Sequence, residues 1–254
     1  MPKLSTLLIL ITSLILGCET SPSPQDEPIN PPAKGFNETD SDPKAIAIAD
    51  EVMEAMGGRK AWDATRFLRF TFNGKRALIW DKLGKKVRIE VPQDSLVYLL
   101  DYKGGYTAKT YQGGELFSEP DSILKYTEQA RRIWINDTYW LVMPFKLKDS
   151  GVTLAYVGEE ETESGEAADL IELTFDGVGV TPQNKYQVWV SKQDRLVIQW
   201  AYFREASEAE PRIVTPWRGY QEYDQILLSG DRGPLQLGDI SAPKSLPTEL
   251  FETL

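Results

Sequence analysis

Most of the side chains that carry out enzyme chemistry are missing from this sequence. Its 254 residues include no histidine and a single cysteine, Cys18. Without imidazole the chain lacks Ser/His/Asp and Cys/His nucleophilic systems, the usual general base near neutral pH, and the common ligands of zinc, copper and haem. We therefore expect no catalytic residues, no metal and no cofactor.

Carboxylates remain, because the chain has 38 Asp and Glu side chains. Glycoside hydrolysis needs only two of them across a cleft, although no pair here stands out by its spacing. The densest group is Glu159, Glu160, Glu161, Glu163 and Glu166. It lacks the alternating Asp or Asn and the glycine of a calcium loop, and clustered like charges between two strands are typical of a solvated hairpin loop. We favour the hairpin over a calcium site.

Cys18 lies where a lipid attachment site is expected. A basic start at Lys3 is followed by an apolar run from Leu7 to Leu16, which is shorter than the roughly 20 residues of a membrane span but suits an export signal. The run Ile15-Leu16-Gly17-Cys18 resembles the lipobox of bacterial lipoproteins, in which the cysteine is acylated and becomes the mature N-terminus. We expect a signal peptide over residues 1–17 and membrane attachment through the acylated Cys18.

Aromatic side chains are the other chemical signal, since the chain has seven Trp and eleven Tyr. On a curved antiparallel sheet they could fill the core or line a cavity for an apolar ligand. Both possibilities stay open at this point. If a cavity exists, the candidate lining residues are Phe70, Phe72, Trp80, Trp140, Trp189 and Trp200.

The residues after the signal peptide divide into a tether and one domain. Residues 18–42 are rich in Pro, Ser, Asp and Glu and poor in apolar side chains, which predicts an extended tether. Residues 43–254 contain no second linker or repeat and suit a single domain. Its first element should be a helix from Pro43 to Met56, with Asp42 as N-cap and Gly57 and Gly58 as the stop.

Alternating apolar positions predict antiparallel strands through most of the domain. The expected strands are residues 67–72, 76–81, 85–91, 95–101, 152–158, 169–176, 185–191, 196–204 and 219–228. A second helix should run from Glu119 to Asn136, with Ser118 and Asp121 as a capping box. Trp189 and Trp200 should belong to one hairpin. The runs around them are apolar at both alternate sets of positions, so part of this sheet should be covered on both faces.

The order of these elements resembles a known family. An N-terminal helix ending in Met56-Gly57-Gly58, a meander, a central helix, the segment from Asn136 to Leu147 and the hairpin from Val188 into Leu196 follow one another. This layout is similar to the outer-membrane lipoprotein-sorting carriers and their lipid-anchored receptor, and to an uncharacterised family of Gram-negative envelope lipoproteins with that Lol-like fold. The resemblance implies a mainly β (α+β) fold, an incomplete antiparallel β-barrel with helices packed in its concave side.

Two functions follow as expectations. The first is a lipid-anchored protein of the cell envelope, in the outer membrane, whose half-barrel binds a lipid, an acyl chain or a lipoprotein. The alternative is a structural or protein-interaction lipoprotein of the same fold with a packed core. An enzyme acting on envelope glycans ranks third. The formal net charge of −10 argues against nucleic acid as a partner.

Overall fold

The computed structural model describes residues 29–254. Cys18, the expected signal peptide and the first part of the expected tether lie outside the described residues. Within residues 29–254, no helix is both long and apolar enough to cross a membrane.

The chain folds into two antiparallel sheets, each in a fixed strand order. The nine-stranded sheet has the order β12 (Arg218–Tyr223), β13 (Ile226–Arg232), β14 (Leu235–Ser241), β1 (Phe67–Phe72), β2 (Arg76–Asp81), β3 (Lys86–Val91), β4 (Leu96–Asp101), β5 (Thr107–Gln112), β6 (Glu115–Leu116). The five-stranded sheet has the order β11 (Ile213–Pro216), β10 (Val197–Phe203), β9 (Lys185–Ser191), β8 (Ala167–Phe175), β7 (Val152–Glu161). The helices are α1 (Pro43–Ala55), α2 (Gly58–Ala64) and α3 (Pro120–Val142), with 3-10 turns η1 (Pro92–Asp94), η2 (Met143–Lys146) and η3 (Thr248–Phe251).

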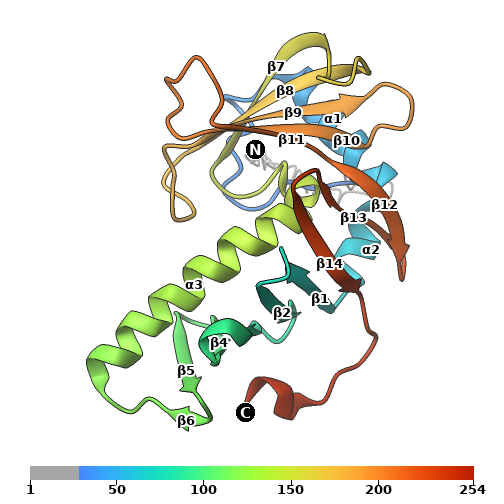
Figure 1. The fold of residues 1–254 in the computed structure, drawn as a ribbon. Coiled ribbons are helices and arrows are strands. Elements are labelled where there is room, and N and C mark those ends of the chain that lie inside the picture. Colours follow the sequence, from blue (N-terminus) through green and yellow to red (C-terminus); the bar gives the residue numbers. More distant parts are fainter. Residues whose placement is uncertain (1–28) are drawn as a thin grey trace, which may run out of the picture.

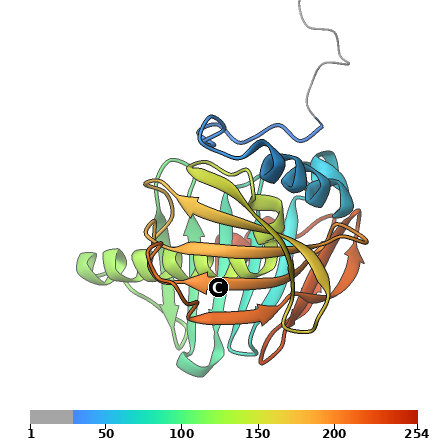
Figure 2. The ribbon, with the colours of Figure 1, turned by 90° about the horizontal axis from the view of Figure 1, so that it is seen from above.

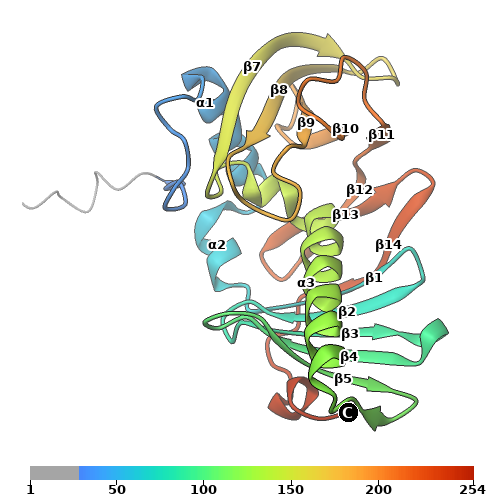
Figure 3. The same ribbon diagram turned by 90° about the vertical axis from the view of Figure 1, so that its left-hand side faces the viewer.

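The two sheets face each other and leave one side of the barrel open. The chain crosses from one sheet to the other where β11 runs through Trp217 into β12. At the far edges, β6 and β7 each pair with one neighbour only. The long helix α3 lies in the concave space between the sheets, and α1 and α2 pack at one end (Figures 1 and 3). The expected mainly β fold with an incomplete antiparallel barrel is therefore confirmed. Of the helices expected in its concave side, α3 lies there, whereas α1 and α2 pack at one end.

One hydrophobic core joins the helices to both sheets. The apolar face of α1 predicted from its spacing is buried, and Asp42 caps the helix by accepting a hydrogen bond from the backbone N–H of Lys44 at 2.7 Å. A second, smaller cluster lies on the outer face of the five-stranded sheet, around Trp189 and Phe203. The two-sided apolar pattern thus buries side chains on both faces of this part of the sheet, although the outer cluster consists of residues of the sheet itself. Figure 2 shows the five-stranded sheet lying over α3.

The predicted boundary between tether and domain is wrong for its last residues. Asn37 N–H donates to the carbonyl of Val152, and Asp42 N–H donates to that of Leu154. The buried hydroxyl of Ser41 accepts from the Leu154 N–H at 3.0 Å and donates to the carbonyl of Asn37 at 2.7 Å. These residues lie along β7 because its edge offers unpaired backbone groups. A polar and proline-rich composition does not reveal such pairing.

The second helix begins and ends later than its sequence predicts. Glu119 is the N-cap residue and makes no side-chain cap bond, so the expected capping box at Ser118 and Asp121 does not form. The helix continues past Asn136 to Val142. The predicted strand over residues 219–228 is also wrong, because a turn at Asp224 with a φ of 61° divides it into β12 and β13.

Gly57 and Gly58 provide a test of the junction between α1 and α2. Their φ angles are 109° and 87°, but a Cβ on Gly57 would lie 2.2 Å from the carbonyl oxygen of Gln225, whereas one on Gly58 would meet nothing within 4 Å. We expect Gly58→Ala to cost about 1 kcal/mol through its φ alone and Gly57→Ala about 2–3 kcal/mol. Urea unfolding measures both. Equal losses would contradict the close approach of Gln225.

Candidate functional site

The candidate site is a cleft between α3 and the five-stranded sheet, made of two adjoining cavities. The uncharged pocket has a volume of about 300 Å³ and is lined by residues from α3, the loop after β8, β9, β10 and β11. The charged pocket has a volume of about 390 Å³ and opens beside α3 toward β2 and the end of β4. Each volume lies in or near the range of small-molecule sites. The side chains shared by both pockets are those of Ile135, Tyr139, Phe175 and Val178, with the backbone of Gly179.

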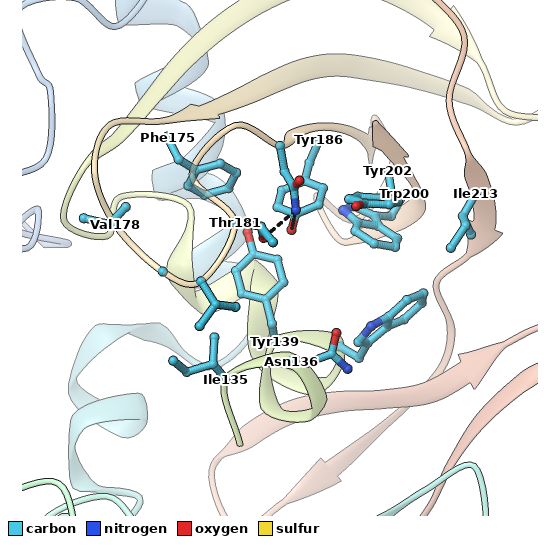
Figure 4. Close-up of a pocket in the computed structure, with 14 residues that line it drawn as sticks. Ile135, Asn136, Tyr139, Phe175, Val178, Thr181, Tyr186, Trp200, Tyr202 and Ile213 are labelled. Carbon is cyan, nitrogen blue, oxygen red and sulfur yellow. Dashed lines mark hydrogen bonds between the residues drawn. The ribbon is translucent and has the colours of Figure 1, made fainter. Parts of the chain in front are cut away.

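Aromatic rings form the walls of the uncharged pocket. Trp200 lies with its ring centroid 4.7 Å from that of Trp140 and 5.1 Å from that of Tyr186. Tyr139 reaches up from α3 toward Tyr186, and their ring centroids are 5.3 Å apart (Figure 4). The other lining residues are Ile135, Asn136, Phe175, Val178, Gly179, Val180, Thr181, Asn184, Tyr202 and Ile213.

The charged pocket has a second aromatic group at its base. Trp134 stacks on Tyr102 with a centroid distance of 4.3 Å and meets Trp80 edge-on at 6.0 Å. The indole N–H of Trp80 donates to the Tyr102 hydroxyl at 2.8 Å. Three cations and one anion also line this pocket: Lys85, Arg131, Lys146 and Asp149.

Burial disfavours ionisation of two phenols in the cleft. It raises the pKa of Tyr102 to about 12 and the pKa of Tyr139 well above its usual value. The hydroxyl of Tyr139 and the indole N–H groups of Trp134 and Trp200 are buried and have no hydrogen-bond partner among residues 29–254. Apart from Asp149, the walls carry no negative charge, and their aromatic side chains pack mainly as apolar surface.

Two contacts from arginine side chains hold α3 in position. Arg76 of β2 forms a bidentate ion pair with the fully buried Asp137. Its Nε donates to Oδ2 at 2.6 Å and its Nη2 donates to Oδ1 at 2.8 Å. Arg232 of β13 is fully buried over the ring of Trp217 and donates to the carbonyl of Trp140 at 2.8 Å. These contacts hold α3 at two points against the nine-stranded sheet. The opposite face of α3, which carries Tyr139, lies toward the cleft.

The predicted site residues fall into three groups. Trp140 and Trp200 line the uncharged pocket, and Trp80 lines the charged one. Phe70 and Phe72 point into the main core and line neither pocket. Trp189 lies on the outer face of the five-stranded sheet. In the hairpin register Trp189 is opposite Gln199 and Trp200 is opposite Val188, so the two indoles point to opposite faces. Their role as ligand contacts stays a prediction.

Part of the lining, including Thr138, Tyr139 and Val142, lies beyond the predicted end of the second helix at Asn136. Trp134, Ile135, Thr138, Tyr139 and Val142 form one stripe of α3 at helical spacing. The sequence Asn136-Asp137-Thr138 favours a helix end, because short polar side chains compete with the helix backbone. Here Asp137 is held by Arg76, and the Thr138 hydroxyl bonds to the carbonyl of Trp134. The helical stripe would have been visible had the helix been extended to Pro144.

The cleft contains little that could act on a substrate covalently. Asp149 is the one acidic side chain among the described residues that line the two pockets. Within residues 29–254, no group of three or more His, Cys, Asp or Glu side chains could hold a metal ion. The arrangement thus offers shape, apolar surface and a few cations to a ligand.

No protein-family model matches the sequence, and no curated protein matches it. Three solved structures are similar to it, each over 82% of this chain and 96% of the other. A DUF1329 family protein from Desulfovibrio piger ATCC 29098 is 14% identical with a TM-score of 0.45. A domain assigned to outer membrane lipoprotein sorting in Vibrio parahaemolyticus is 11% identical with a TM-score of 0.45.

The third is a LolA superfamily protein from Nitrosomonas europaea, 10% identical with a TM-score of 0.37. Two of the three thus belong to the lipoprotein-sorting group that the sequence resembles. Identities and TM-scores this low transfer no function to the chain. The half-barrel described above rests on this chain's own strand order, with α3 between the sheets and an aromatic cleft beside it.

Proposed function

We propose that this chain is a lipid-anchored protein of the bacterial cell envelope that binds an apolar ligand, such as a lipid or an acyl chain, in the cleft beside α3. The observation that carries the proposal is the pair of adjoining cavities lined by Trp80, Trp134, Trp140, Tyr186 and Trp200. A fully packed half-barrel would support the alternative of a structural or interaction protein. The open space beside α3 favours a ligand.

Binding fits the cleft better than catalysis does. Hydrolysis of a glycan needs two facing carboxylates, and the described lining offers one, Asp149. The aromatic walls instead offer a large apolar surface, which drives binding of hydrocarbon at about 25 cal/mol per Å² removed from water. We therefore propose no enzymatic activity.

The anchor and the location are proposed from the sequence. Ile15-Leu16-Gly17-Cys18 resembles a lipobox, and acyl chains on Cys18 would hold the domain at a membrane, which we propose to be the outer membrane. We expect Cys18→Ala to abolish incorporation of radiolabelled palmitate, because the chain has no other thiol. Equal labelling of the variant and the unchanged chain would rule out this anchor.

The ligand proposal is tested by native mass spectrometry. Residues 19–254, secreted without lipidation and purified without detergent, are expected to carry an added mass that organic extraction removes. The segment 29–42 is kept in this protein because it pairs with β7. A protein that shows only its own mass, and that also fails to bind a fluorescent fatty acid, would support the packed interaction protein instead.

A further inference from the structure

The two pockets of the cleft differ in charge. None of the 14 residues that line the uncharged pocket is charged. The charged pocket is lined by Lys85, Arg131 and Lys146 against a single acidic residue, Asp149. This excess of positive charge is local, because the chain as a whole has a formal net charge of −10.

The three cations are only partly engaged by their neighbours. Lys85 is exposed and makes no ion pair among residues 29–254. Its ammonium lies 5.7 Å from the centre of the Tyr102 ring. Arg131 lies over Tyr106 and shares Glu128, at 3.1 Å, with Arg132. Lys146 pairs with Asp149, whose side chain is 41% exposed. Exposed pairs of this kind are weak, so the cations remain free to meet a bound anion.

Positive charge is crowded at this end of the cleft. Lys82 lies next to it, over the ring of Trp62, and donates to the carbonyl of Trp62. Burial is the largest cause that lowers the pKa of Lys82 to about 7; the charge of Asp63 opposes this shift, and the charges of Arg59, Lys146 and Lys85 add to it. Near pH 7 the Lys82 ammonium is therefore partly deprotonated in the free protein. An anion bound nearby would relieve the same repulsion.

We infer that the ligand is an anionic amphiphile, with its apolar part in the uncharged pocket and its carboxylate or phosphate at Lys85, Arg131 and Lys146. The inference rests on the proposed binding of an apolar ligand and adds its chemical class and its direction. The uncharged pocket offers only neutral hydrogen-bonding groups, such as those of Asn136 and Thr181, so a charged head there would lose its water without gaining an opposite charge. In the charged pocket it gains charge-assisted hydrogen bonds from lysine and arginine. The hydrocarbon then lies past Tyr139, against Trp140 and Trp200.

The test compares two probes with the same chain, dansyl-labelled undecanoic acid, whose head is negatively charged, and its methyl ester, whose head is neutral. The protein is residues 19–254, as above, and binding is followed by dansyl fluorescence. We expect the acid to bind at least about tenfold more tightly than the ester. The triple variant Lys85→Gln, Arg131→Gln, Lys146→Gln should bind the acid about tenfold more weakly and the ester unchanged. Lys75→Gln, in the exposed β1–β2 turn, is the matched control and should change neither.

The outcomes separate the two proposals. If acid and ester bind equally, or if the triple variant still prefers the acid, the proposal of an anionic head at these three cations is overturned. The proposal of apolar binding is then unaffected. Failure of both probes to bind the unchanged protein overturns both proposals. Where the preference is found, displacement of the probe by palmitate or by lysophosphatidylglycerol distinguishes a carboxylate head from a phosphate head.

Discussion

Arg76→Ala is expected to lower the free energy of unfolding by about 3–5 kcal/mol, because it leaves a buried carboxylate without its partner. Asp137 is fully buried in α3, and Arg76 supplies both of its strong hydrogen bonds from β2. Asn136 adds one more, at 2.9 Å, from the neighbouring position on the helix. Urea unfolding of residues 19–254 measures the loss. Arg69→Ala is the matched control, since Arg69 is exposed on the adjacent strand β1.

The loss should depend on pH in a direction that identifies its cause. Burial raises the pKa of Asp137 even in the unchanged protein, and Arg76 opposes that rise. Without Arg76 the pKa of the folded state rises further above that of the unfolded state. A raised carboxyl pKa means that the folded state holds the proton more tightly, so stability falls as the pH rises through that range. Arg76→Ala should therefore cost less at pH 4 than at pH 7.

A double variant separates charge from packing. Arg76→Met combined with Asp137→Leu removes both charges and keeps side-chain volume, so most of the lost stability should return. A double variant as unstable as Arg76→Ala would show that the pair acts through a specific geometry that hydrophobic packing cannot replace. A loss that is the same at pH 4 and pH 7 would show that the carboxylate charge is not its source.

Much of the fold follows from local sequence patterns. The start of α1 was predictable because Asp42 and Pro43 suit a helix N-terminus, and β2 and β9 begin and end at the predicted residues. What local patterns could not show was pairing between distant segments. The strand β5 was missed because it is largely exposed and polar, and β14 because glycine and polar residues interrupt its alternation. Both are held by their neighbours in the sheet.

The candidate site was predicted less well, for a similar reason. Aromatic content indicated a lined cavity, but which face each ring occupies depends on strand register. Trp189 and Trp200 lie on adjacent strands, and a single step in register decides that they point to opposite faces. Part of the stripe of α3 that lines both pockets was hidden because it lies beyond Asn136. The contact of Asp137 with Arg76, 61 positions away in the sequence, is not visible in the local pattern there.

Because their indoles point to opposite faces of the sheet, Trp189 and Trp200 form a matched pair for substitution. Both indoles are more than nine-tenths buried, and both lie on one hairpin. Truncation of either to Ala removes a large buried ring and should cost about 3–5 kcal/mol. Trp200→Phe and Trp189→Phe keep an aromatic ring, so they serve as milder variants if the alanine variants do not fold.

The two alanine variants should lose similar stability but should differ in their affinity for the ligand probe. Trp200 forms a wall of the uncharged pocket with Trp140 and Tyr186, whereas Trp189 packs against Leu170 and Phe203 on the outer face. We expect Trp200→Ala to weaken binding of the dansyl fatty acid at least about tenfold, the equivalent of about 1.4 kcal/mol. Trp189→Ala should leave the affinity of the folded protein unchanged. Equal weakening by both would mean that the probe responds to overall stability and not to contact with Trp200, and that the ligand lies elsewhere.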